Sequence, residues 1–217
     1  MLKYECAKSR EEWLKKRAGR NGIGASEAAA VCGLSKWKTP AELWEEKTGR
    51  KSPKDLSDVE YVQLGVRCEG PMRDLFGALN PGFLITYRPY DMLYQTERPW
   101  LFATLDGELT DLERQERGIL EIKKFEIQSR EDWKSWNGQI PDYYYTQICH
   151  QFLACGEDFQ FAMLWALILS HNGNGSLRPY YFRRTDCEED MEWLLEKEEK
   201  FMADVKADRP PAVPLTI

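Results

Sequence analysis

The chain has 217 residues, enough for one sizeable hydrophobic core, and its 42% hydrophobic and 30% charged residues are ordinary for a globular domain. No stretch approaches the roughly 18–20 consecutive apolar residues that span a bilayer. Segment 1–12 is charged and lacks the apolar region of a secretory signal. We therefore expect no membrane association and a cytoplasmic location, in a host cytoplasm if the gene is viral.

The cysteines and histidines restrict the metal chemistry. None of the six cysteines stands in a C-x-x-C pair, so we expect reduced thiols and no structural zinc or iron–sulfur site. Two histidines, His150 and His171, are too few for a histidine-rich centre. Any bound metal should therefore have oxygen ligands, which suits Mg²⁺ or Mn²⁺.

The charge is unevenly distributed along the chain. The net charge is −6, yet residues 1–54 carry 13 basic and 7 acidic side chains, and residues 186–208 carry ten acidic side chains and three lysines. An acidic protein can still bind DNA along one positive groove. Ordinary solvated helix faces are the simpler interpretation of these charges alone.

Helix signals dominate residues 1–80. A short amphipathic helix is predicted over residues 10–16, and a glycine turn at 22–24 precedes an Ala-rich helix with Ser26 as its expected N-cap. Two capping boxes, Thr39-Pro40-Ala41-Glu42 and Ser57-Asp58-Val59-Glu60, predict helices that end near Gly49 and Leu79.

Residues 81–206 are predicted to contain a sheet. β-branched, aromatic and alternating residues indicate strands at 83–94, 101–104, 107–112, 118–125, 159–168 and 178–184, with helices at 141–155 and 188–205. The order predicts a single α/β domain over 1–206, in which a mixed central β-sheet is flanked by α-helices. Residues 207–217 are rich in proline and are expected to form an extended tail.

The most informative segment is Asp106-Gly107 followed by Glu121-Ile122-Lys123. Side chains alternate on a strand, so Glu121 and Lys123 share one face while Ile122 points into the core. A hairpin through the polar residues 113–117 would bring Asp106 alongside Glu121. Surface hairpins often carry such Glu and Lys pairs, but the apolar flanks here indicate a buried strand whose charges need partners or a metal.

This arrangement predicts a phosphodiester-cutting site. Asp106 and Glu121 would hold a hard divalent cation, with the backbone carbonyl of Ile122 as a further ligand. The cation would neutralise a phosphate oxygen and lower the pKa of a bound water. Lys123 would orient or help deprotonate that water and stabilise developing charge.

The glycine turn offers a second candidate site. A turn at 22–24 that feeds a helix N-terminus presents backbone N–H groups to an anion, with Ser26 as an added donor and a nearby arginine as a clamp. A plain helix cap with solvated basic residues explains the pattern equally well.

Three further segments extend the pattern, and with them the chain resembles the lambda exonuclease/YqaJ-type viral recombinase family of the PD-(D/E)xK nuclease superfamily. The first segment runs from Trp13-Leu14-Lys15-Lys16-Arg17 through Gly22-Ile23-Gly24-Ala25-Ser26-Glu27 to Lys47-Thr48-Gly49. The second runs from Leu64-Gly65 through Glu69 to Phe76, and the third covers residues 141–151. The resemblance covers roughly residues 10–165.

The resemblance implies a restriction-endonuclease-like core that digests one strand of duplex DNA from a 5′ end, with two Mg²⁺ or Mn²⁺ ions. It implies that Glu69 adds an acidic group and metal ligand to the pair Asp106 and Glu121, that Lys123 is the catalytic lysine, and that Gln147 assists. Arg17 and Ser26 match positions that hold the 5′ phosphate, although residues 18–21 separate Arg17 from the glycine turn and make Arg20 a rival. A homotrimeric ring and a single-strand annealing partner are also implied.

Two rival functions remain open from the sequence. One is a structure-specific or restriction-type DNA endonuclease of the same fold, and the other is a non-catalytic DNA-end-binding recombination protein. Several aromatic residues have two interpretations as well. Core packing is the more usual role for Tyr143–Tyr145, which could stack on bases, and for Trp133 and Trp136, which follow the catalytic strand and could form a lid or wedge.

Overall fold

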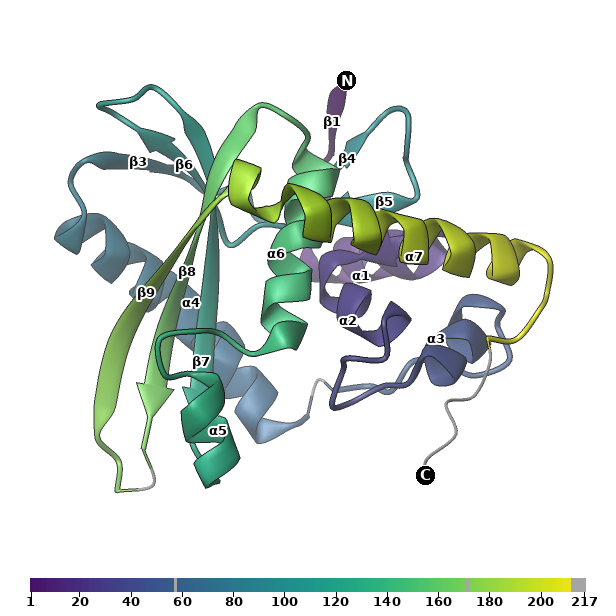
Figure 1. Cartoon of the computed structure of the whole chain (residues 1–217), viewed down its shortest axis with the longest axis horizontal. Helices are drawn as coiled ribbons and strands as arrows, with labels where there is room; N and C mark the ends of the chain where they lie inside the picture. The colour runs from purple at the N-terminus through teal and green to yellow at the C-terminus, as the bar shows by residue number, and fades with distance from the viewer. Residues whose placement is uncertain (57, 171, 212–217) are drawn as a thin grey trace.

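A computed structural model describes residues 1–56, 58–170 and 172–211. Ser57, His171 and residues 212–217, which include most of the expected proline-rich tail, lie outside the described residues. The described chain forms the predicted mixed α/β domain, drawn in Figure 1. Among the described residues, no helix combines the length and apolar character needed to cross a membrane.

The N-terminal part contains α1 (Arg10–Gly19), the 3-10 turn η1 (Ala25–Glu27), and the helices α2 (Ala28–Val31), α3 (Pro40–Lys47) and α4 (Glu60–Leu79). The predicted capping box at α3 is confirmed, because the Thr39 hydroxyl accepts the Glu42 N–H at 3.2 Å. The predicted N-cap Ser26 is wrong, since Ser26 lies inside η1 and Gly24 is the N-cap of that turn; the Gly24 N–H donates to the Glu27 carboxylate at 2.8 Å. The N-cap of α4 is Val59, and the predicted capping box at this end rests on Ser57, which lies outside the described residues.

The strands form two sheets instead of the one central sheet that was predicted. The larger has the order β3-β6-β7-β8-β9 and the smaller β1-β4-β5-β2. The larger sheet contains β3 (Phe83–Thr86), β6 (Gly107–Asp111), β7 (Arg117–Glu126), β8 (Phe159–Leu169) and β9 (Gly175–Arg183). The smaller contains β1 (Leu2–Glu5), β2 (Ile23–Gly24), β4 (Met92–Gln95) and β5 (Leu101–Ala103), so residues 1–80, which were expected to be helical, also supply two strands.

The predicted strand 83–94 is divided between the two sheets. The chain leaves β3 at Thr86 and enters β4 at Met92. Between them Tyr90 has a left-handed backbone, with a φ of 67°, and Asp91 is buried. A left-handed residue stops a regular strand, which is why this apolar segment pairs with two different sheets.

Helices cover both faces of the larger sheet. The parallel pair β7 and β8 is buried on both faces, as parallel strands commonly are. On one face Ile119 and Leu164 pack against α6 (Asp142–Cys155) and α7 (Glu188–Lys206). On the other face Leu120 and Trp165 pack against α4, which lies behind the sheet in Figure 1. The short α5 (Arg130–Ser135) and the turn η2 (Arg184–Cys187) complete the described elements.

Candidate active site

Strand β7 presents Glu121 and Lys123 on the face that α6 covers, while Ile122 packs into the core on the other face, as the alternation predicts. The last residue pair between β6 and β7 is Gly107 with Leu120. The N–H of Ile122 therefore has no partner in β6, and the Asp106 carboxylate accepts it at 2.7 Å. The hairpin between β6 and β7 thus brings the predicted site residues together across the sequence.

The Glu121 carboxylate is held on both oxygens. Its side chain is almost fully buried, with a total exposure of 2% for the residue. One oxygen lies 2.5 Å from the Lys123 ammonium and accepts the Gln147 amide at 2.6 Å. The other oxygen accepts the Gln151 amide at 2.5 Å. Gln147 was expected here, whereas Gln151 was missed; its position one helical turn beyond Gln147 is the signal that could have found it.

Helix α4 contributes Glu69 and Arg73, which lie one turn apart. The Arg73 guanidinium donates to the backbone carbonyl of Asp106 at 2.6 Å and lies 3.5 Å from the centre of the Tyr87 ring. Glu69 lines the same cavity as Asp106, Glu121 and Lys123, and the volume of this cavity is about 520 Å³. Arg73, which the sequence did not single out, therefore ties the loop that carries Asp106 to the helix that carries Glu69.

The acidic residues of this cavity repel one another. Burial and the charge of Glu121 raise the pKa of the Asp106 carboxyl well above its usual range, although Lys123 opposes the shift. Burial and Glu121 also raise the pKa of Glu69. Burial alone would lower the pKa of Lys123, but the charges of Glu121 and Asp106 outweigh it and raise the pKa. Lys123 is therefore a stable ammonium, and the cavity keeps an excess of carboxyl groups.

The oxygen atoms that line this cavity are of the kind that binds a hard divalent cation. The carboxyl groups of Glu69, Asp106 and Glu121 repel one another, so a cation among them would relieve that repulsion. The N–H and C=O of one residue in a strand point to the same edge, so the Ile122 carbonyl faces the side on which Asp106 accepts the N–H. In the described part of the chain, no three His, Cys, Asp or Glu side chains form a ready-made metal cage.

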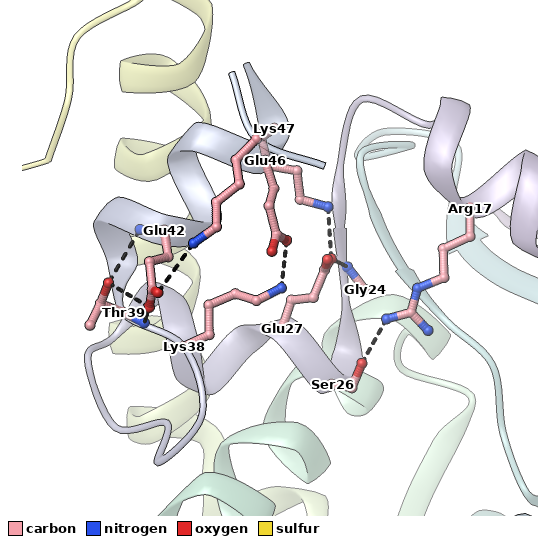
Figure 2. Close-up of polar contacts among 10 residues, drawn as sticks. Arg17, Gly24, Ser26, Glu27, Lys38, Thr39, Glu42, Glu46 and Lys47 are labelled. Atoms are coloured by element: carbon pink, nitrogen blue, oxygen red, sulfur yellow. Dashed lines mark hydrogen bonds and ion pairs between the residues drawn. The ribbon is translucent and has the colours of Figure 1, made fainter. Parts of the chain in front are cut away.

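Arg17 and Ser26 lie in the wall of the same cavity. Figure 2 shows the Arg17 guanidinium donating to the Ser26 hydroxyl, at 2.7 Å. The Gly24 N–H is already bound to the Glu27 carboxylate, and Lys47 donates to that carboxylate at 2.8 Å. The predicted anion site on backbone N–H groups is therefore wrong at Gly24. Of the predicted anion site, the side chains of Arg17 and Ser26 line the cavity.

Arg20, the alternative to Arg17 as a phosphate-binding residue, is held by contacts within the protein. Its guanidinium donates to the Pro99 carbonyl at 3.0 Å, forms an ion pair with Glu5, and lies 4.1 Å from the centre of the Tyr94 ring. Arg20 lines a neighbouring cavity of about 720 Å³, but it does not line the cavity that contains Asp106. Of these two arginines, only Arg17 lines the cavity that contains Asp106.

Most of the other residues that the sequence singled out, a histidine and two tryptophans, are buried in the core. His150 is fully buried; its ring nitrogens lie 2.6 Å from Glu198 and 3.0 Å from the Phe102 carbonyl, so it is a core residue. Trp136 is fully buried as well, whereas Trp133 on α5 is 46% exposed. The two tryptophans that follow β7 therefore lie in different environments.

Comparisons with known proteins identify the family of this chain. The family described as YqaJ-like viral recombinase domain matches residues 12–158. The protein YqaJ of Bacillus subtilis is 32% identical over 160 residues, which are 74% of this chain and 47% of YqaJ, so the chain spans about half the length of that relative.

Solved structures show the same fold. The alkaline exonuclease LHK-Exo of Laribacter hongkongensis superposes with a TM-score of 0.63 at 19% identity, over 91% of this chain and 93% of that one. LHK-Exo in complex with dAMP superposes with a TM-score of 0.61 at 18% identity, with the same coverage. Because the family match spans residues 12–158, which is more than half of the chain, the chain belongs to the YqaJ-like viral recombinase domain family.

Proposed function

We propose that this chain is a metal-dependent exonuclease that digests one strand of double-stranded DNA from its 5′ end during recombination. The observation that carries the proposal is the single cavity lined by Asp106, Glu121, Lys123, Arg17 and Ser26. Carboxylates that suit a divalent cation, a stable ammonium and an arginine–serine pair that suits a phosphate all face the same space.

Each residue has a role that its contacts support. Asp106, Glu121 and Glu69, with the Ile122 carbonyl, would hold Mg²⁺ or Mn²⁺, up to two ions. When bound, such ions neutralise phosphate charge and lower the pKa of a water ligand. The raised pKa of Lys123 keeps it protonated, so it orients water and stabilises charge on the phosphate as a donor, not as a base.

The arginine–serine pair would distinguish a DNA end from the interior of a duplex. Arg17 can bind two phosphate oxygens at once, and the Ser26 hydroxyl can donate to a third. One similar structure, LHK-Exo, was solved with dAMP, a deoxynucleotide that carries a phosphate. Gln147, which binds the Glu121 carboxylate, would keep that carboxylate oriented during the reaction.

Assembly and partners belong to the same proposal. Family resemblance supports a homotrimer that encircles the duplex and a single-strand annealing protein that receives the undigested strand. A sedimentation measurement of the purified chain tests the trimer directly: a monomer at the concentrations where DNA is cut would reject it.

The central experiment is digestion of a 5′-phosphorylated linear duplex with Mg²⁺. We expect Lys123→Ala and Glu121→Ala to lower the rate by about 10²–10³-fold or more, the usual cost of losing one charge-stabilising group. Lys124→Ala is the matched control, because Lys124 is the next residue of β7 and forms an ion pair with Glu126 instead. Undiminished cutting by both site variants would reject the site.

A closed circular duplex separates the proposal from an endonuclease of the same fold. The exonuclease requires an end, so we expect no cutting until the circle has been linearised. Nicking of the closed circle would establish the endonuclease. Tight binding to DNA ends with no hydrolysis in Mg²⁺ or Mn²⁺ would establish a non-catalytic end-binding protein.

A further inference from the structure

An exposed aromatic surface lies next to the candidate active site. It consists of the exposed rings of Trp37 and Trp133 and the cations Lys36 and Arg178, and we name it the tryptophan surface; Tyr143, which contacts Trp37, is buried. Trp37 is 61% exposed and Trp133 is 46% exposed, although tryptophan is among the most highly buried residues on average. Exposed aromatic rings of this kind mark an interaction site.

Aromatic contacts join this surface to the catalytic lysine. The Lys123 ammonium lies 5.0 Å from the centre of the Tyr144 ring. The Tyr144 and Tyr143 ring centres are 4.5 Å apart, and those of Tyr143 and Trp37 are 5.0 Å apart. Three consecutive contacts of about 5 Å therefore lead from Lys123 to the exposed Trp37.

Cations accompany the rings. The Lys36 ammonium lies 5.2 Å from the centre of the Tyr143 ring, and it lies 3.2 Å from Asp132 of α5. The ion pair ties the loop that carries Trp37 to the helix that carries Trp133. The Arg178 guanidinium lies 4.9 Å from the centre of the Trp133 ring, and among the described side chains it has no acidic partner.

We propose that the tryptophan surface binds single-stranded DNA, namely the undigested strand as it leaves the active site. Interleaved aromatic rings and cations are the chemistry of single-strand binding, because every base can stack on a ring and every phosphate is an anion. The inference rests on the proposed function, since digestion of one strand is what exposes unstacked bases. Figure 1 shows α5, which carries Trp133, beside the end of the catalytic strand β7.

The test is binding of a labelled single-stranded oligonucleotide of about 12 nucleotides, within the usual range of single-strand sites. The full chain is used with EDTA, so that no cutting occurs, and fluorescence anisotropy gives the dissociation constant. Stacking of one base is worth about 1–3 kcal/mol, so we expect Trp37→Ala and Trp133→Ala each to weaken binding by about 5- to 150-fold. Trp37→Tyr, which keeps a ring, should retain most of the affinity.

Trp193→Ala is the matched control. Trp193 is 46% exposed, as Trp133 is, and the Lys197 ammonium lies 5.4 Å from its ring centre, but it belongs to α7, which Figure 1 shows apart from α5. Equal binding by Trp37→Ala, Trp133→Ala and Trp193→Ala would overturn the inference and leave the surface to a protein partner. Failure of the wild-type chain to cut DNA would refute the proposed function alone, because binding is measured without metal.

Discussion

The two glutamines that hold Glu121 should differ in their contribution to stability. Gln147 donates to the oxygen that Lys123 also contacts, whereas Gln151 is the donor to the other oxygen. A hydrogen bond to a charged group contributes about 1.5–3 kcal/mol. Gln151→Leu removes such a bond and leaves one oxygen of a buried carboxylate without its donor.

The loss is partly offset. The amide oxygen of Gln151 is itself buried without a partner, so its removal relieves a small cost. We expect Gln151→Leu to lower the free energy of unfolding by about 2 kcal/mol, which for a domain of this size lowers Tm by about 4–8 °C. Gln147→Leu should cost less than half as much, because Lys123 still neutralises the oxygen that Gln147 leaves.

Thermal and urea unfolding in EDTA at neutral pH measure the difference. Metal is removed because a cation bound to Glu121 would stabilise the folded chain and hide the change in stability caused by losing either glutamine. Half-buried Gln160, whose amide donates to the backbone carbonyl of Glu157, provides the control variant Gln160→Leu. If Gln147→Leu destabilises the chain as much as Gln151→Leu, the unequal sharing of the carboxylate is refuted.

Three further predictions concern the charges and the packing of the site. Asp106 binds its proton more tightly in the folded chain than in the unfolded chain, because its pKa is raised on folding. Without metal, the stability of the chain therefore falls as pH rises above the usual aspartate range. Asp106→Asn should remove this loss, raise the free energy of unfolding at neutral pH by about 0.5–2 kcal/mol and abolish the rise in Tm on adding Mg²⁺. A Cβ on Gly118 would lie 2.3 Å from the buried Phe161 ring, so Gly118→Ala should cost about 1–3 kcal/mol or more in urea unfolding. Arg17→Ala should remove the preference for 5′-phosphorylated over 5′-hydroxyl duplex ends with little loss of stability, whereas Arg20→Ala should lower Tm and keep that preference.

Each of these predictions has a contradicting outcome. A Tm for Asp106→Asn that is lower than that of the wild type across neutral pH would show that the carboxylate stabilises the metal-free fold. Unchanged stability of Gly118→Ala would mean that Phe161 has room to move. An end preference that is lost in Arg20→Ala and kept in Arg17→Ala would reverse the assignment of the two arginines.

The local pattern of β7 could be predicted from the sequence because it depends on neighbouring residues alone. Alternation on a strand places Glu121 and Lys123 on one face and Ile122 on the other, whatever the strand pairs with. The capping box at Thr39 and the apolar run of β8 are local in the same sense. The α/β class follows from the order of such elements and is confirmed.

Contacts between distant segments could not be predicted in this way. The division of residues 83–94 between two sheets lies at Pro89 and the left-handed Tyr90. Pro89 lacks the N–H that a strand needs and was the sequence signal for the break, whereas a tyrosine gives no signal for a left-handed backbone. The N-cap expected at Ser26 failed because the Arg17 guanidinium binds its hydroxyl and the Glu27 carboxylate binds the Gly24 N–H.

The sequence by itself determined which groups could do the chemistry: two acidic residues and a lysine on a strand and its neighbour, and an arginine and a serine near a glycine turn. Only the tertiary structure decided that Arg17 rather than Arg20 faces the cavity, and that Gln151 and Arg73 hold Glu121 and Asp106 in place. The physical reason is that these contacts join elements that lie far apart along the chain, and their partners are chosen by the packing of α4 and α6 on the sheet.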